Sequence, residues 1–347
     1  MLSLKQWKNQ RTQFEAAGIQ LPAGDVDAVR TAGKQQPSWI HVGGGNLYRA
    51  FHAAIAQDLI DAGKLDRGVV VFETLRPFTV DELYHPFNCD ILQVVMKSDG
   101  SLSERVLSST ADALFANVQR PEDWERAKSF FRSPVLQLVT VTITEKGYGL
   151  RDADGSFSEQ ALADFFAGPA APTTTMATFA ALLLERFNAG AAPIAMVSTD
   201  NFSRNGEHFR SAVLDVAQAW QQAGHVGQEF VDYVSDESRV SFPWTMIDRI
   251  TPNPSTETEH ALAKQGFSDL PLISAGRSTF AGFSNTEEAH YLVVEDSFPN
   301  GRPDLTAGGV ILCDRTTAEA ADTMKVTACL NPLHTTLAVY GCLLGYT

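Results

Sequence analysis

Three polar side chains lie in an otherwise apolar stretch near the end of the sequence: Lys325, Asn331 and His334. A lysine kept out of water loses its charge readily, so it can act as a base near neutral pH. Asn331 and His334 are three residues apart, so in a helix they share a face. The alternative is purely structural. Lys325 would lay its stem on apolar surface with the amine in water, and His334 would be a satisfied core residue.

A second chemical pattern is the glycine turn Gly43-Gly44-Gly45-Asn46-Leu47, which follows an apolar run and precedes a helical pattern. Glycines let backbone amides approach a pyrophosphate at the positive end of a helix. Gly43 and Gly45 match the first two glycines of the dinucleotide fingerprint, and Tyr48 replaces the third. Such turns also occur without any ligand, so the turn alone is weak support for a cofactor.

An acidic residue strengthens the prediction of a nicotinamide cofactor. Glu73 ends the strand predicted after the glycine turn, where a carboxylate holds the ribose of NAD and repels the extra phosphate of NADP. Arg76 lies close by in the sequence and weakens that preference. We therefore expect NAD as the cofactor.

Polar residues also follow two later predicted strands, in the segments Thr142–Tyr148 and Ser198–Asn201. Ligands of parallel α/β sheets bind beyond the carboxyl ends of the strands. A neutral amide such as Asn201 can donate a hydrogen bond to a developing alkoxide. The alternative is that these residues only cap the helix that follows.

The elements that must position these residues alternate between short apolar runs and amphipathic stretches. Continuous apolar strands separated by helices indicate a parallel sheet covered on both faces. The sequence therefore predicts an α/β fold, a Rossmann-like doubly wound sheet. The predicted strands are 38–42, 68–72, 135–143 and 193–197, and the predicted helices are 50–62, 159–167, 176–189 and 207–223.

The remaining segments depart from this alternation. Residues 91–95 and 104–107 resemble extra strands, which we expect at one edge of the sheet. The chain is rich in turns from residue 251, with strand-like runs at 291–294 and 310–312, and its pattern is helical after Asp314. We expect a dinucleotide-binding domain over 1–315 and the beginning of a helical substrate domain over 316–347. The apolar end of the sequence suggests that the rest of that domain is missing.

Composition narrows the function classes. The 27 Lys and Arg against 41 Asp and Glu give a net charge of −14, which argues against nucleic acid or an anionic membrane as the main partner. Four scattered cysteines predict neither a disulfide framework nor a metal site. The charged start lacks the apolar core of a signal peptide. We expect a soluble cytoplasmic protein, a monomer or a weak dimer, with no metal.

Taken together, these motifs resemble the long-chain polyol dehydrogenase (mannitol dehydrogenase) family. The resemblance rests on Lys325 with Asn331-x-x-His334, on Asp200-Asn201, on Met246–Pro252, on the glycine turn and on Thr142–Tyr148. It covers nearly the whole chain, with five motifs in the family's order. Within the family, Glu295–Arg302 and Met324–Tyr346 are most similar to fructuronate reductases.

The resemblance implies a zinc-independent, NAD-linked oxidoreductase that interconverts D-fructuronate and D-mannonate. It gives Lys325 the role of general acid and base and gives Asn201 and Asn331 the role of oxyanion donors, while His334 and Asp248 would hold the substrate. It also implies a set of cofactor contacts: Gly43, Gly45, Asn46, Leu47, Glu73, Thr142, Glu145 and Asp200.

One departure from the family pattern leads to a structural prediction. Five residues separate Lys325 from Asn331, one more than the family pattern has. In a regular helix, the extra residue would rotate Lys325 by about 100° away from His334. We therefore predict a π-bulge or kink between Lys325 and Pro332, which would restore a shared face.

Several alternatives stay open at this stage. A mannitol- or arabinitol-type 2-dehydrogenase and a tagaturonate reductase share the same motifs. Arg204, Arg277 and Arg302 are candidates for binding a substrate carboxylate, although each could equally be in a surface ion pair. A nucleotide-binding regulatory module without turnover is the alternative from another class, and the joint presence of Lys325, Asn331 and His334 argues against it.

Overall fold

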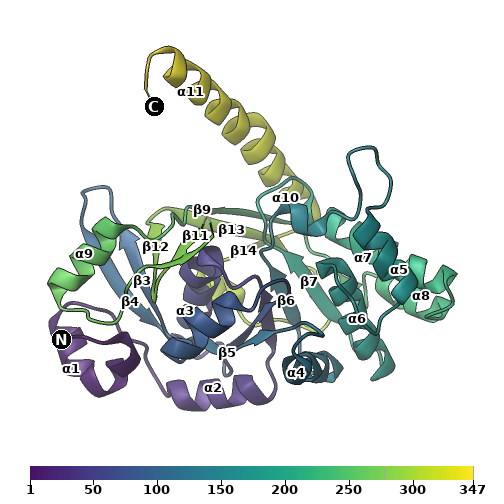
Figure 1. Cartoon of the computed structure of the whole chain (residues 1–347), viewed down its shortest axis with the longest axis horizontal. Helices are drawn as coiled ribbons and strands as arrows, with labels where there is room; N and C mark the ends of the chain where they lie inside the picture. Colours follow the sequence, from purple (N-terminus) through teal and green to yellow (C-terminus); the bar gives the residue numbers. More distant parts are fainter. Residues whose placement is uncertain (277, 347) are drawn as a thin grey trace.

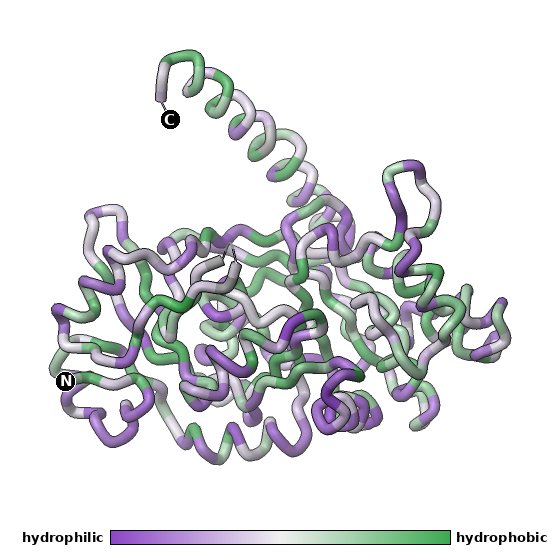
Figure 2. Tube along the Cα trace, in the orientation of Figure 1, coloured by the Kyte–Doolittle hydropathy of each residue, from purple (hydrophilic) through white to green (hydrophobic). Residues whose placement is uncertain are grey.

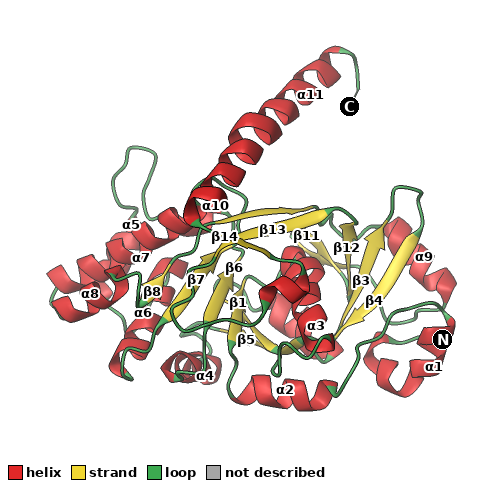
Figure 3. Ribbon diagram, turned by 180° about the vertical axis from the view of Figure 1, so that it is seen from behind, coloured by secondary structure: helices red, strands yellow, loops and turns green. Residues whose placement is uncertain are grey.

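Six parallel strands form the central sheet of the chain (Figures 1 and 3). The computed structural model describes residues 1–276 and 278–346, without the side chains of residues 275, 278 and 331. The strand order β5-β2-β1-β6-β7-β8 is that of the doubly wound dinucleotide-binding fold, with the reversal of winding between β1 and β6. The strands are β1 (Trp39–Val42), β2 (Val69–Glu73), β5 (Thr110–Phe115), β6 (Leu138–Val141), β7 (Ile194–Ser198) and β8 (Val240–Ser241). The predicted Rossmann-like fold is confirmed.

Both faces of this sheet are buried, which explains why its strands are continuous apolar runs. Val70 and Phe72 point into one core, whereas Val69 and Val71 point into another. The first core is closed by α4 (Pro121–Arg132), α5 (Glu159–Ala167), α6 (Thr175–Asn188), α7 (Asn205–Gln222) and α8 (Gln228–Ser235). The second is closed by the π-helix η2 (Tyr48–His52) with α3 (Ala53–Asp61) and by a small sheet.

That small sheet has the order β14-β13-β9 and carries one side of the candidate site. Its strands are β9 (Thr245–Arg249), β13 (His290–Glu295) and β14 (Ile311–Cys313). β9 and β13 are antiparallel, with Asp248 opposite Tyr291. Residues 291–294 and 310–312 were therefore correctly predicted as strand segments.

The expectation of extra strands at one edge of the main sheet was wrong in its placement. The strands exist, as β3 (Ile91–Met96) and β4 (Leu102–Leu107), but they form a separate sheet of order β12-β3-β4. Their partner β12 (Phe283–Glu287) lies far along the chain and pairs in parallel with β3. Residues of these strands share a hydrophobic core with the N-terminal segment, a long-range contact with no local sequence signal.

The other elements complete the two ends of the molecule. They are η1 (Leu4–Gln10), α1 (Arg11–Ala16), α2 (Val26–Gln35), η3 (Val80–Tyr84), η4 (His85–Phe87), η5 (Glu145–Tyr148), α9 (Thr256–Gln265), β10 (Ile273–Ala275), β11 (Ser278–Phe280) and η6 (Leu305–Gly308).

A long helical segment ends the chain and leaves the body of the molecule (Figure 1). It consists of α10 (Arg315–Asp322), the π-helix η7 (Thr323–Leu330) and α11 (Asn331–Leu343). Asp314 begins it by accepting a 2.7 Å hydrogen bond from the Thr317 amide, as an N-cap residue does. Hydrophobic residues alternate with polar ones along the projecting α11 (Figure 2), and Leu337 is 69% exposed.

No helix within residues 1–276 and 278–346 combines the length and the apolar character needed to cross a membrane.

Candidate functional site

The glycine turn follows β1, and two of its glycines, Gly43 and Gly45, meet different structural requirements. Gly43 has φ +103°, and a Cβ atom there would lie 2.0 Å from the carbonyl oxygen of Thr142. No other residue fits that position. A Cβ atom on Gly45 would meet nothing within 4 Å, so the backbone there faces open space. A helix begins at the next residue, Asn46, and the first amides of a helix have no acceptor within it.

A cavity of about 560 Å³ opens beside this turn. It lies where β1 and β6 end, at the reversal of winding where open α/β sheets bind their ligands. Of the expected cofactor contacts, Gly43, Gly45, Glu73 and Thr142 line it. Four others, Asn46, Leu47, Glu145 and Asp200, lie outside its lining.

Glu73, at the end of β2, is locked onto the glycine turn. One carboxylate oxygen accepts a 2.8 Å hydrogen bond from the Gly44 amide, and the Tyr84 hydroxyl donates a 2.8 Å bond to the Gly44 carbonyl. Burial raises the pKa of Glu73 above its ordinary value, although the Gly44 amide acts in the opposite direction. A carboxylate beside an open helix start fits a dinucleotide, with phosphate at the turn and ribose at Glu73.

Two buried histidines lie beneath the ends of β1 and β6, beside the glycine turn. The sequence analysis did not single them out. His41 Nδ1 lies 2.7 Å from Thr140 Oγ1, and its Nε2 lies 2.9 Å from Thr142 Oγ1 and 3.2 Å from the Gly43 carbonyl oxygen. The ring of His52 is centred 4.6 Å from that of His41. Burial lowers the pKa of both, that of His52 to about 3, so both rings are neutral at pH 7.

Asp200, at the end of β7, fastens the neighbouring strand end rather than lining the cavity. Its two oxygens accept 2.9 Å hydrogen bonds from the amides of Ile143 and Thr144, and the Tyr148 hydroxyl donates a third at 2.7 Å. Thr144 has φ +65°, which a β-branched residue rarely adopts. Asp200 therefore holds a strained cavity-lining residue in place.

Lys325 lies in the π-helix η7, so the predicted distortion of the helix before Pro332 is confirmed. Its side chain is buried, and its amine lies 3.1 Å from Asp248 Oδ1. The same amine donates to the Ile247 carbonyl and lies 5.6 Å from the centre of the Tyr291 ring. The Asp248 side chain keeps 45% of its surface exposed, so it faces both the lysine and the solvent.

Asp322 joins this helix to the loop that carries Asn201, and it too was missed in the sequence analysis. It is buried one turn before Lys325, and its Oδ2 accepts from the Ser203 hydroxyl at 2.6 Å and the Arg204 amide at 3.2 Å. The loop after β7 and the C-terminal helical segment are thereby held together. Asn201 is exposed on that loop, and no hydrogen bond to its side chain is present in the described part of the chain.

The other expected site residues are not gathered into one arrangement by the described structure. His334 is exposed on α11, and the side chain of Asn331 lies outside what the structure describes. Arg302 is bound to Asp296 through two hydrogen bonds, of 2.7 and 2.8 Å. Arg204 pairs with Glu207 at 2.8 Å. Both arginines are thus in surface ion pairs, and Arg277 lies outside the described residues.

Comparison with known proteins places this geometry in a family. The chain is 46% identical over 339 residues to the D-mannonate oxidoreductase of Thermotoga maritima, covering 97% of this chain and 62% of that protein. It therefore spans less than two thirds of that relative's length.

Two solved structures share the fold. A substrate-free D-sorbitol dehydrogenase superposes with a TM-score of 0.77 at 27% identity, covering 95% of this chain and 63% of that one. The complex of Pseudomonas fluorescens mannitol 2-dehydrogenase with NAD and D-mannitol gives 0.75 at 28% identity, covering 95% and 61%. The family model for the mannitol dehydrogenase Rossmann domain matches residues 37–306, and this chain belongs to that family.

Proposed function

We propose that this chain is the cofactor-binding and proton-transferring part of an NAD-linked D-mannonate oxidoreductase. The reaction is D-fructuronate + NADH + H⁺ giving D-mannonate + NAD⁺, and it is reversible. The observation that carries the proposal is the 46% identity, over 97% of the chain, to the oxidoreductase of Thermotoga maritima with that name.

The cavity beside the glycine turn, called the cofactor crevice from here on, has residues that fit a nicotinamide dinucleotide. Gly43 and Gly45 would admit the pyrophosphate to the helix start at Asn46, and Glu73 would hold the adenosine ribose. Bound there, the cofactor would supply or accept the hydride. Leu47, Thr142, Glu145 and Asp200 complete the proposed set. Asp200 acts through the bonds it makes to Ile143 and Thr144.

Lys325 is the proposed acid and base. During reduction its ammonium would give a proton to the substrate oxygen, and during oxidation its amine would take the hydroxyl proton. Asp248, 3.1 Å from that amine, would orient it and use its exposed half to hold the substrate. Asn201 and Asn331 would donate hydrogen bonds to the reacting oxygen, and His334 would hold the substrate from α11.

The proposed division of the chain follows from these roles. Residues 1–315 would form the cofactor-binding domain, and 316–347 would begin a helical substrate domain. A cytoplasmic location accords with a cofactor of central metabolism and with the acidic, cysteine-poor composition.

A side-by-side assay tests the proposal. NADH and NADPH oxidation would be followed with D-fructuronate, D-tagaturonate and D-fructose. We expect the highest kcat/KM with D-fructuronate and NADH, and no loss of activity with a metal chelator. A preference for D-fructose would indicate a mannitol 2-dehydrogenase, the activity named for a relative that is 28% identical. NADH binding without turnover of any substrate would favour the non-catalytic alternative.

A further inference from the structure

Two phenylalanine rings lie together in the wall of the cofactor crevice, although they are far apart in the chain. Phe78 follows β2, and Phe280 ends β11. Their ring centres are 5.6 Å apart, with the ring planes inclined by 47°. Both side chains are half-buried, and Leu75, in the same lining, is 63% exposed. The crevice therefore has an apolar, partly aromatic wall that is open to a ligand.

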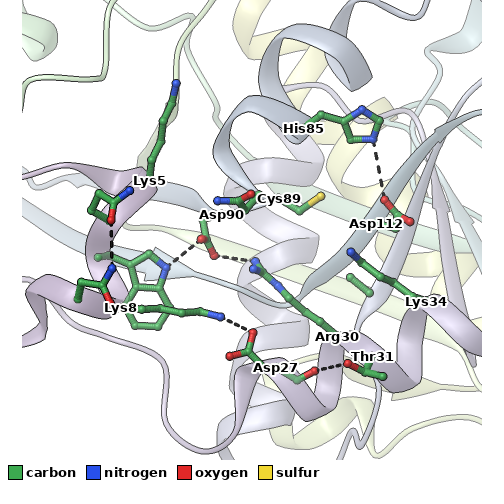
Figure 4. Close-up of a pocket in the computed structure, with 15 residues that line it drawn as sticks. Lys5, Lys8, Asp27, Arg30, Thr31, Lys34, His85, Cys89, Asp90 and Asp112 are labelled. Carbon is green, nitrogen blue, oxygen red and sulfur yellow. Dashed lines mark hydrogen bonds and ion pairs between the residues drawn. The ribbon is translucent and has the colours of Figure 1, made fainter.

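Another large cavity, of about 590 Å³ beside η1 and α2, has a different lining (Figure 4). Most of its side chains are charged or polar, and ion pairs join several of them, as between Asp90 and Arg30 at 2.6 Å. Ligand pockets are mainly apolar and aromatic, with a few polar groups that fix the orientation of the ligand. The crevice has that character, and the cavity beside η1 does not.

The aromatic wall lies where the base of a bound dinucleotide is expected. The proposed function places the pyrophosphate at the glycine turn and the adenosine ribose at Glu73. The ribose joins the base to the phosphate, so the base lies beyond Glu73 as seen from the glycine turn. Leu75 and Phe78 follow Glu73 in the chain and line the same cavity.

Phe280 is held at the crevice by the helix that begins at the glycine turn. Arg49, buried in the first turns of that helix, donates a 2.5 Å hydrogen bond to the carbonyl of Ala281. The Ser284 hydroxyl donates a second bond, of 3.3 Å, to the Asn46 carbonyl. Burial lowers the pKa of Arg49 to about 10, so the side chain keeps its charge at pH 7. Hydrogen bonds from a charged donor are stronger than neutral ones, so Arg49 fixes the residue next to Phe280.

Phe78 is tied to the same turn through η3, which begins two residues after it. Tyr84, the last residue of η3, donates its 2.8 Å hydrogen bond to the carbonyl of Gly44. Both rings are thus positioned by bonds to the glycine turn or its helix. Their arrangement exists before a ligand arrives, which lowers the cost of binding.

We propose that Phe78 and Phe280 form the subsite for the adenine ring of the cofactor, with Arg49 as the positioning residue that holds Phe280 there. The inference rests on the proposed function, because it takes the crevice as the NAD site. An adenine ring presents a π-face, which aromatic side chains cover in offset or edge-on contact.

The experiment compares Phe280→Leu with Phe165→Leu in titrations of the full chain with AMP and with NADH. Each substitution keeps an apolar side chain and removes an aromatic face. Phe165 is the matched control, because it is also half-buried, its ring centre lies 4.9 Å from that of Phe157, and it is outside the crevice lining. AMP carries only the adenosine half of NADH, so the two ligands together show which half contacts Phe280.

We expect Phe280→Leu to bind both AMP and NADH about tenfold more weakly than the wild type. Phe165→Leu should stay within about twofold for both ligands. Phe78→Leu, which leaves Arg49 and its bond untouched, should weaken both ligands in the same direction as Phe280→Leu.

Equal binding by Phe280→Leu and Phe165→Leu would overturn the subsite and leave the proposed function standing. A loss for NADH with AMP unchanged would also overturn it, because the nicotinamide half would then contact the ring. A wild type without saturable NADH binding would overturn the subsite and the proposed function together.

A double variant tests the positioning role of Arg49. Arg49→Lys keeps the charge but loses the planar fork, so it should weaken AMP binding about threefold. The same change in a Phe280→Leu background should weaken AMP binding no further, because Arg49 acts through Phe280. Additive losses in the double variant would show that Arg49 acts independently of Phe280, which would overturn its positioning role.

Discussion

The two halves of the candidate site are built differently. At the cofactor crevice, the key polar side chains have fixed partners: the buried His41, His52 and Asp200 and the half-buried Glu73. On the C-terminal helix, the first turns have such support, through Lys325 and Asp322. Farther along that helix, His334 and the apolar residues of α11 are exposed.

This difference shows which groups the described fold holds in place before a ligand binds and which groups it leaves exposed to solvent. The crevice has its hydrogen bonds in place before a ligand arrives, and such preorganisation lowers the cost of binding. The amine of Lys325, the proposed acid and base, is equally well positioned, but the expected substrate contacts are not. We therefore expect the cofactor site and the acid and base to be sensitive to single substitutions, and α11 to be tolerant.

The largest effect should come from Lys325→Ala. Loss of a general acid and base lowers kcat by a factor of about 10² to 10⁴. Affinity for NADH, followed by fluorescence titration, should change less than about twofold, because the crevice does not include this residue. Retention of most of the activity would show that another group transfers the proton.

A pair of glycine variants tests the rigidity of the crevice. Gly43→Ala should lower the free energy of unfolding by about 2 kcal/mol or more, because its Cβ atom would overlap the Thr142 carbonyl at a left-handed φ. Gly45→Ala should change stability by less than about 0.5 kcal/mol but weaken NADH binding, because its methyl group would stand in the open cavity. Urea denaturation and NADH titration measure the two quantities. Similar stability losses in both variants would contradict the distinct roles of these glycines.

The buried histidines predict a pH dependence of stability. The folded-state pKa of His52 is about 3, well below the ordinary value of 6.5, so the unfolded chain binds more protons as the pH falls below 6.5. Stability should therefore fall on acidification from pH 7 to pH 5, by about 2 kcal/mol for His52 alone. His52→Asn should reduce this slope in urea denaturation at the two pH values. An unchanged slope would mean that His52 already carries its charge in the folded protein.

A smaller effect is expected for Asp322→Ala, which removes the hydrogen bonds between the Asn201 loop and the helix of the proposed acid and base. Losing hydrogen bonds to a charged group costs about 1.5 kcal/mol or more, so kcat should fall about tenfold. The KM for NADH should stay constant, and Asp322→Asn should recover part of kcat. A change in NADH affinity with kcat intact would place Asp322 in the cofactor half instead.

The smallest effect is expected on α11. Leu337 is 69% exposed, so Leu337→Ala should change the free energy of unfolding of this chain by less than about 0.5 kcal/mol. Leu59→Ala, in the buried α3, should cost about 2 to 5 kcal/mol. A large loss for Leu337→Ala in thermal denaturation would show that α11 is packed in solution, for example against a second copy.

Much of the fold was predictable, because its signals are local. Apolar runs of strand length, the glycine turn and helical periodicity predicted the parallel sheet and the helices α5, α6 and α7. The count of residues between Lys325 and Asn331 predicted the distorted helix. The pairing of β3 with β12 was not predictable, since strands so far apart in the chain select each other through packing.

For the candidate site, the residue types were enough to propose the chemistry but not the supporting contacts. The sequence by itself determined where the crevice had to be, because the glycine turn follows the first predicted strand and glycine tolerates the backbone conformation needed at Gly43. Only the tertiary structure decided that Glu73 binds Gly44, that Asp248 pairs with Lys325 and that Asp322 holds the Asn201 loop. These contacts join residues distant in the sequence, and their energy exists only once burial has removed the competing water.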